Sequence, residues 1–190
     1  MPQKPRYKRE EILAAALEIA AEKGIDALSV RELRNSLGCS VSPIFTVFDS
    51  MQEIHEEVRK TAFRYFEEYA RETLPDRPLL MQLGMKMVML GVQEPNLYQL
   101  LFMQKKQEAA AIEELFDELG ELTALCLELM EKDYGLSPAQ AKQVFQDVWI
   151  YAFGLGALCA TRACRFTEEE LSDMLKEEFH ARLAQIQGKQ

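Results

Sequence analysis

The sequence predicts an all-α protein of about nine helices. Three observations support this class: the 190 residues are rich in Ala, Leu, Glu, Gln, Lys and Met, apolar positions recur at helical spacing, and only 9 Gly and 7 Pro interrupt them. No segment shows the convincing alternation of a strand. We expect a three-helix bundle over residues 1–52, joined rigidly to a helical bundle over residues 53–190.

Three short helices are expected before residue 50. Residues 8–23 carry an apolar stripe at helical spacing, and Gly24 follows them as a C-cap. Ser29 and Glu32 form a capping box, in which each side chain accepts a hydrogen bond from a backbone amide at a helix start. This box opens a second helix, which Gly38 ends.

The third short helix should begin near Ser40 or Ser42. Pro43 would lie in its first turn, where the missing amide hydrogen costs nothing. A second capping box at residues 50–53 then opens a long helix to about residue 73. We expect the buried side of the third helix to consist of Ile44, Phe45 and Phe48.

A turn at residues 74–78 separates the long helix from the C-terminal half of the chain. Two more caps, Ser137 and Thr167, mark helix starts further on. The remaining helices are expected over residues 79–93, 95–103, 108–133, 137–164 and 167–186.

Charge is distributed unevenly along the chain, whose net charge is −9. Residues 1–64 hold 10 basic and 10 acidic side chains, whereas residues 65–190 hold 12 and 21. The first nine residues carry Lys4, Arg6, Lys8 and Arg9 and no acid. A basic arm on an acidic body is typical of a protein that contacts phosphate at one end only. The alternative is a disordered, solubilising N-terminus.

The four cysteines, at positions 39, 126, 159 and 164, form no Cys-x-x-Cys pair, and no secretory signal precedes them. Reduced thiols in a cytoplasmic protein fit this pattern best. The longest uncharged apolar stretch, residues 148–161, has 14 residues and is too short to span a bilayer. It is typical of a buried helix.

An all-α enzyme is the weakest interpretation. A ferritin-like di-iron site needs two Glu-x-x-His motifs, and the sequence has only Glu177 with His180. The other histidine, His55, follows Gln52 instead. With two histidines and no plausible nucleophile–base pair, we expect no enzyme activity, no cofactor and no metal.

Residues 29–48 have the spacing of a helix-turn-helix, whose second helix would enter the major groove of DNA. Its outward residues are small and uncharged, so they would read base edges through hydroxyls and methyl contacts. A structural helical hairpin with no DNA is the alternative. The expected DNA-binding residues are Lys4, Arg6, Lys8, Arg9, Ser29, Arg31, Ser40, Val41, Ser42, Pro43, Thr46, Val47 and Ser50.

Residues 8–58 resemble the N-terminal domain of the TetR/AcrR family of bacterial regulators. The order, spacing and caps agree over about a quarter of the chain. The matching segments are Ile12-Leu13-Ala14-Ala15-Ala16, Lys23-Gly24, Leu28-Ser29-Val30-Arg31-Glu32-Leu33, Leu37-Gly38-Cys39-Ser40, Ile44-Phe45-Thr46-Val47-Phe48, and Ser50 with Ile54.

The resemblance has departures that bear on DNA binding. The family commonly has a Gly or Ala near Pro43, a Tyr at Phe45, a His at Val47 and a Lys at Met51. The three polar groups, which usually contact phosphate, are lost, so the phosphate contacts should rely more on the arm, on Thr46 and on backbone amides. The Ser-Pro-Ile-Phe form is similar to a subgroup of such regulators from low-GC Gram-positive bacteria.

The resemblance implies a homodimer in which the last two helices form a four-helix bundle about a two-fold axis. Small residues in the eighth helix suit a close backbone approach. Packing within one subunit is the alternative. The expected interface residues are Ala152, Gly154, Gly156, Ala157, Ala160, Leu171, Leu175 and Phe179.

The resemblance also implies a ligand pocket in the C-terminal bundle. Five of the nine methionines lie within residues 81–103, and adaptable Met side chains suit an apolar cavity. A plain core is the alternative. The expected lining residues are Met85, Met89, Tyr98, Phe102, Met103, Cys126, Met130, Phe145 and Trp149.

The function expected from these features is transcription regulation by a homodimeric repressor, which a small apolar or amphipathic ligand releases from a palindromic DNA operator. A DNA-binding protein of the same architecture without a small-molecule effector is the main alternative. The sequence does not identify the ligand, the operator or the regulated genes.

Overall fold

The computed structural model describes residues 7–71, 78–105, 108–109, 111–117 and 120–188. Lys4 and Arg6 of the basic arm lie outside the described residues. The described residues form ten α-helices and one short 3-10 helix, and none of them lies in a strand. The all-α class is therefore confirmed.

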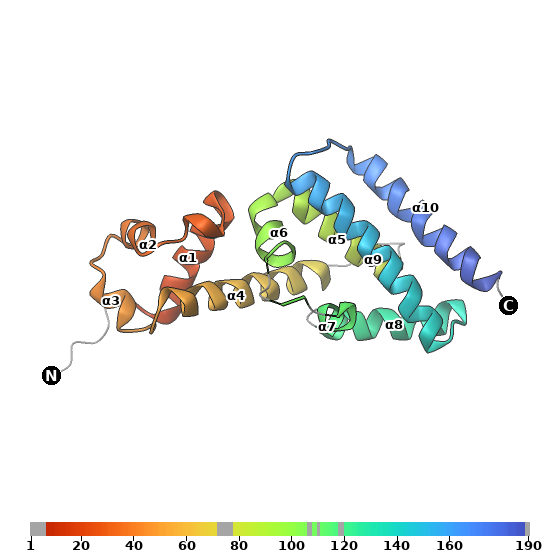
Figure 1. The fold of residues 1–190 in the computed structure, drawn as a ribbon, viewed down its shortest axis with the longest axis horizontal. Coiled ribbons are helices and arrows are strands. Elements are labelled where there is room, and N and C mark those ends of the chain that lie inside the picture. The colour runs from red at the N-terminus through yellow and green to blue at the C-terminus, as the bar shows by residue number, and fades with distance from the viewer. Residues whose placement is uncertain (1–6, 72–77, 106–107, 110, 118–119, 189–190) are drawn as a thin grey trace.

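Four α-helices and the 3-10 helix occupy the N-terminal third of the chain (Figure 1). Ser29 caps the second helix, since its Oγ accepts a hydrogen bond from the Glu32 amide, and Ser50 Oγ caps the fourth by accepting one from the Glu53 amide. Gly38 ends the second helix in the left-handed region, at φ 61°. These elements are α1 Arg9–Lys23, η1 Ile25–Ala27, α2 Val30–Leu37, α3 Ser42–Phe45 and α4 Met51–Arg71.

Six helices follow in the C-terminal part. Ser137 and Thr167 cap the last two, as their sequence predicts, with reciprocal hydrogen bonds to Gln140 and Glu170. The single helix expected over residues 108–133 is wrong: it is two helices, because Gly120 adopts a φ of 61° that an α-helix excludes. The helices are α5 Leu79–Gln93, α6 Pro95–Phe102, α7 Ile112–Asp117, α8 Glu121–Tyr134, α9 Pro138–Ala160 and α10 Glu168–Gln187.

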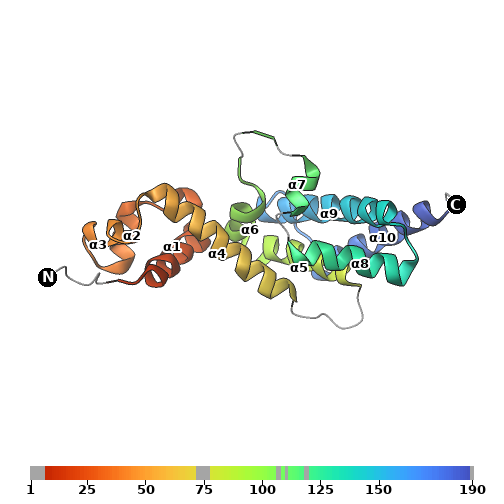
Figure 2. The same cartoon turned by 90° about the horizontal axis from the view of Figure 1, so that it is seen from below.

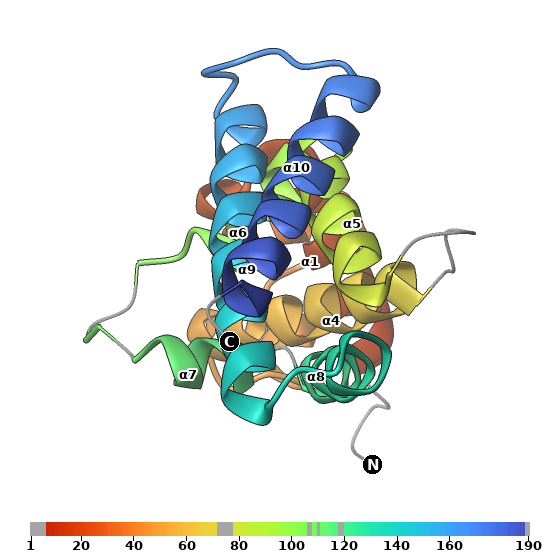
Figure 3. The same cartoon turned by 90° about the vertical axis from the view of Figure 1, so that its right-hand side faces the viewer.

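The molecule has a head and a body. We call α1, η1, α2, α3 and the first turns of α4 the head, and the rest of α4 with α5–α10 the body. Figures 1 and 2 show the head at one end and α4 running from it towards the body. Seen end-on in Figure 3, α10 lies against α9 and α5.

The core of the head comes from the apolar stripes of its helices. Ile12 and Ala16 of α1, Leu33 of α2, Ile44 of α3 and Ile54 of α4 are fully buried. Burial of each Ile or Leu side chain stabilises a fold by about 1.5–3 kcal/mol. The short α3 is therefore held in place by its neighbours rather than by its own hydrogen bonds.

The body is built around the contact between α5 and α9, where two glycines allow close packing. A Cβ on Gly156 would lie 2.5 Å from the Tyr98 ring, and one on Gly91 would lie 2.6 Å from the Gly156 carbonyl oxygen. The Tyr98 hydroxyl donates a 2.7 Å hydrogen bond to the Phe153 carbonyl, which ties α6 to α9. Burial raises the pKa of the Tyr98 hydroxyl, so it stays protonated as a donor.

The joint between head and body is formed mainly by α6. This helix packs against both α1 and α4. The Asn96 side-chain amide donates a 2.8 Å hydrogen bond to the Ala21 carbonyl near the end of α1. A displacement of α6 therefore acts directly on the head.

Candidate functional site

Two exposed apolar side chains of the helix-turn-helix lie at α3. Val41 and Phe45 leave 38% and 40% of their surface exposed, although both are apolar. The expectation that Phe45 is buried is wrong, because Ile44 and Phe48 already fill the core beside α3 and Phe45 lies about 100° further round the helix than Ile44. Val41 and Phe45 thus form an exposed apolar pair at the two ends of α3, of a kind that can contact the methyl group of a thymine.

Polar groups flank this pair. Thr46 Oγ1 donates a 2.8 Å hydrogen bond to the Ser42 carbonyl, so its hydroxyl is left to accept a hydrogen bond from any further partner. Pro43 and Val47 are half-buried, and Val47 packs against the core. The remaining predicted residues are exposed: Lys8, Ser29, Arg31, Ser40, Ser42 and Ser50.

Arg9 has a structural role that the sequence analysis missed. Its guanidinium lies 2.8 Å from a Glu53 carboxylate oxygen, 3.6 Å from one of Glu57, and 4.2 Å from the centre of the Phe48 ring. The hydrogen bond to Glu53 raises the pKa of Arg9. The positive charge of Arg9 is thus paired with carboxylates inside the head. Among the described residues of the basic arm, Lys8 is the other cation, and it is exposed.

The Glu53 carboxylate joins three elements. The Asp49 amide donates a 2.7 Å hydrogen bond to it, and this bond and the Arg9 guanidinium lower the pKa of Glu53. The sequence does contain Arg9 at the start of α1 and the carboxylates Glu53 and Glu57, four residues apart, in α4. The register of this network became visible only in the fold.

The residues predicted to line a ligand pocket mostly pack against one another inside the body. Met85, Cys126, Met130, Phe145 and Trp149 are buried, as is Tyr98. Cys126 is only 1% exposed, and this burial raises the pKa of its thiol to about 12. The Phe116 ring packs edge-on against Phe145 and Trp149, at centroid distances of 5.1 and 5.3 Å. Met89 and Phe102 are half-buried and Met103 is exposed.

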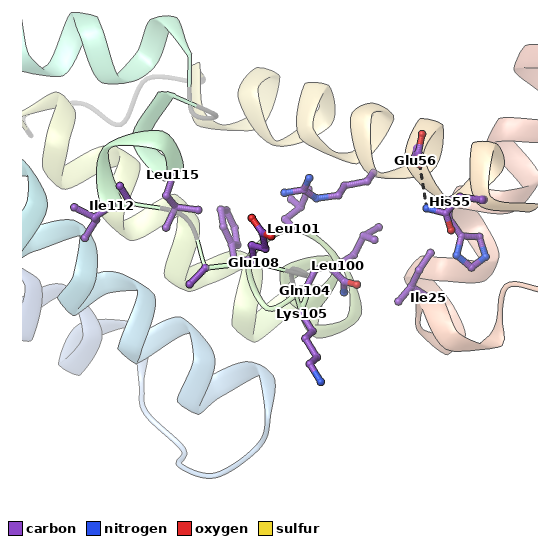
Figure 4. A pocket seen from close by; sticks show the side chains of 15 residues that line it. Ile25, His55, Glu56, Leu100, Leu101, Gln104, Lys105, Glu108, Ile112 and Leu115 are labelled. Atoms are coloured by element: carbon purple, nitrogen blue, oxygen red, sulfur yellow. Dashed lines mark hydrogen bonds between the residues drawn. The ribbon is translucent and has the colours of Figure 1, made fainter.

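A cavity of about 830 Å³ lies elsewhere, where the head meets the body (Figure 4). Its walls come from η1, the start of α4, α6, described residues of the segment between α6 and α7, and α7. We call it the junction pocket. Of the nine predicted lining residues, only Phe102 belongs to it. Its lining includes Ile25, His55, Leu101, Phe102, Ile112 and Leu115.

The predicted dimer residues fall on two faces. Ala152, Gly156 and Ala160 are buried and face the inside of the body, as are Leu171, Leu175 and Phe179 of α10. Packing within one subunit accounts for these six. Gly154 and Ala157 are only partly covered.

The outward face of α9 carries a different stripe. Ile150 and Leu158 are 45% and 38% exposed, and Gly154 lies between them at the same spacing. A Cβ on Gly154 would meet no atom within 4 Å, so no contact inside the protomer requires a glycine there. The i, i+4, i+8 spacing of these residues could have revealed this stripe from the sequence.

The comparisons with known proteins agree on one architecture. Residues 12–58 match the model of the bacterial regulatory proteins of the tetR family. A TetR-family transcriptional regulator from Vibrio parahaemolyticus has a similar structure, with 18% identity, coverage of 92% of this chain and 98% of that chain, and a TM-score of 0.66. No curated protein sequence matches this chain.

Two further structures were solved with bound molecules. FadR from Thermus thermophilus, a TetR-family transcriptional repressor in complex with lauroyl-CoA, is 16% identical, covers 93% of each chain and has a TM-score of 0.58. BioQ, solved with its natural double-stranded DNA operator, is 19% identical, covers 94% of this chain and 99% of its own, and has a TM-score of 0.56.

The chain therefore has the fold of the TetR-family transcriptional regulators, and residues 12–58 match the model of that family's N-terminal domain. The resemblance expected over residues 8–58 is confirmed over residues 12–58. Within the described residues, no helix is both long enough and apolar enough to cross a membrane.

Proposed function

We propose that this protein is a DNA-binding transcriptional regulator, a homodimeric repressor that a small molecule releases from a palindromic operator. The observation that carries the proposal is the exposed face of α3 on a head that matches the TetR-family N-terminal domain. BioQ, whose fold is similar, was solved on its operator. A reading helix presented in this way fits the major groove.

The chemistry of α3 favours contacts through shape and methyl groups. Val41 and Phe45 are exposed apolar side chains, and Ser42 adds a hydroxyl. α3 and its flanking residues carry no Lys or Arg, so the reading surface itself adds no charge for phosphates. We propose that Lys8, together with Lys4 and Arg6, supplies most of the electrostatic attraction.

We propose that the outward face of α9 forms the centre of a two-fold dimer interface. Ile150, Gly154 and Leu158 form an apolar stripe that the protomer leaves uncovered. A self-complementary interface would place two copies of α9 side by side, and a glycine allows the backbones to approach closely. Two heads related by a two-fold axis match the symmetry of a palindrome.

A second candidate is a DNA-binding protein of this fold without a small-molecule effector. The burial of most of the predicted lining residues in the body favours this candidate. Of the nine predicted residues, only Phe102 lines the junction pocket. The junction pocket favours the first candidate. The two proteins differ in whether a bound molecule changes the affinity for DNA.

The DNA-binding proposal is tested by titrating the purified protein against a labelled duplex from its own upstream region, at 50 and 200 mM salt. We expect saturable binding that weakens steeply with salt, since each neutralised phosphate contributes to the slope. An unrelated duplex of equal length is the control and should bind more weakly. Binding that is absent, or that is independent of salt, would overturn the proposal.

A further inference from the structure

We infer that the junction pocket, and not the interior of the body, is the effector site, and that it takes an uncharged, largely apolar molecule. The inference rests on the proposed function, since an effector has meaning only for a protein that binds DNA. Its volume of about 830 Å³ is that of a site for a drug-sized ligand.

The pocket is lined by both parts of the molecule (Figure 4). Ile25 of η1 and His55 of α4 belong to the head. Leu101 and Phe102 of α6, with Ile112 of α7, belong to the body. A molecule in this pocket would touch head and body at once. Its binding energy would therefore depend on the position of the head relative to the body.

The apolar lining is concentrated on the body side. Leu101, Phe102, Ile112 and Leu115 present aliphatic and aromatic groups from α6 and α7. Phe102 also packs edge-on against Phe66 of α4, with ring centroids 5.3 Å apart, so this wall is anchored to the long helix. Apolar walls of this kind favour an aromatic or aliphatic ligand body.

Among the described residues that line the pocket, cations and anions are equal in number. Arg59 and Lys105 are cationic, and Glu56 and Glu108 are anionic. The Glu56 carboxylate also accepts a 3.0 Å hydrogen bond from the Gln52 side chain. A charged ligand would lose its hydration without a net opposite charge to replace it, so an uncharged ligand is favoured.

His55 connects the junction pocket to the start of the helix-turn-helix. Its Nε2 lies 3.1 Å from the Leu28 carbonyl oxygen, and since a carbonyl only accepts, the ring nitrogen donates. Leu28 precedes Ser29, the cap of α2. A ligand that shifts His55 or Ile25 therefore moves the start of the helix-turn-helix without a chain of intermediate residues. By linkage, DNA must alter the affinity for the ligand by the same factor.

The site is tested with three dyes: Nile red, which is uncharged and apolar, anilinonaphthalene sulfonate, which is anionic, and rhodamine 6G, which is cationic. We expect Nile red to bind saturably with one site per protomer and at least tenfold more tightly than either charged dye. Equal or tighter binding of a charged dye at the same site would overturn the ligand class.

Two substitutions locate the dye. Ile112→Trp fills the pocket from the body, and Gln52→Trp fills it from the exposed start of α4, so a folding defect in one leaves the other informative. Each should weaken Nile red binding at least tenfold. Leu125→Trp on α8, at a side chain that is 43% exposed and outside the pocket, is the matched control. If all three variants bind the dye like the parent, the site lies elsewhere.

The regulatory step is tested by repeating the DNA titration with saturating Nile red. We expect the dissociation constant for DNA to change at least fivefold in the parent protein and to stay unchanged in Ile112→Trp. If the protein binds DNA but the dye leaves that affinity unaltered, the inference fails and the DNA-binding function stands. If the dye binds in the pocket but no DNA binds, the proposed function fails instead.

Discussion

An exposed aromatic ring stands at the end of α3. Phe45 shows 40% of its surface, and neither the head core nor the body needs it for packing. Phe45→Ala should therefore leave the free energy of unfolding within about 0.5 kcal/mol of the parent. It should weaken operator binding by roughly tenfold, or about 1.4 kcal/mol, because an apolar contact in the groove is lost.

The measurement for Phe45→Ala is fluorescence anisotropy with the upstream duplex at two salt concentrations. The salt slope should not change, since the substitution removes no charge. Tyr65→Ala is the matched control, because Tyr65 is an aromatic residue with 51% exposure on α4, away from α3. Unaltered affinity in Phe45→Ala would show that α3 does not contact the DNA through this ring.

Two glycines of α9 should respond in opposite ways to the same substitution. Gly156→Ala places a methyl group 2.5 Å from the Tyr98 ring, so we expect a loss of about 1–3 kcal/mol in the free energy of unfolding. Gly154→Ala meets no atom of the protomer and should not destabilise the isolated fold. Urea unfolding at a low protein concentration distinguishes them, and equal effects would contradict this assignment.

At the scale of elements, an ion-pair network holds the start of α1 against α4. The pKa of Glu53 is lowered in the folded head, first by the Asp49 amide and then by Arg9. A carboxyl group with a lowered folded pKa contributes stability above its unfolded pKa of about 4.3, and this contribution is lost as the pH falls through the folded pKa. The head should therefore loosen below about pH 4.

Glu53→Gln tests this network. The variant should be less stable than the parent at pH 7, and the difference should shrink as the pH falls towards about 3, because the parent loses the same interaction by protonation. Thermal unfolding followed by circular dichroism at both pH values measures it. Glu68→Gln, an exposed carboxyl further along α4, should behave like the parent. A difference that persists at low pH would point to packing rather than charge.

At the scale of elements, the ends of helices are predictable from the sequence, but the directions in which their faces point are not. Caps such as Ser29 and Thr167 predict helix starts, because they act through hydrogen bonds within four residues. The rotation of a helix about its axis depends on its neighbours, so the sequence does not separate the small residues of α9 that pack inside the body, such as Ala152 and Gly156, from those on its outward face, such as Gly154. The junction pocket combines η1, α4, α6 and α7 and has no local signature.

At the scale of the whole molecule, the head and the body are joined through α6 and α4. The Asn96 side-chain amide donates a hydrogen bond to the Ala21 carbonyl at this joint, and the junction pocket lies beside it. In the homodimer that we propose, a small rotation at each joint would change the separation of the two α3 helices. Such a change would lower the affinity for DNA because both heads must fit successive turns of one groove.

The proposed dimer makes the final prediction, Ile150→Glu on the outward face of α9. A carboxylate at this position would be buried against its own copy across the two-fold axis, where like charges repel and lose hydration. Sedimentation should show a monomer at a concentration where the parent is a dimer. Operator affinity should fall on the order of 100-fold, since the second head no longer binds as part of one molecule. Leu125→Glu, with a similar exposure of 43% on α8, should keep both properties. A dimer of unchanged stability in Ile150→Glu would place the interface on another face and leave Gly154 without a structural reason.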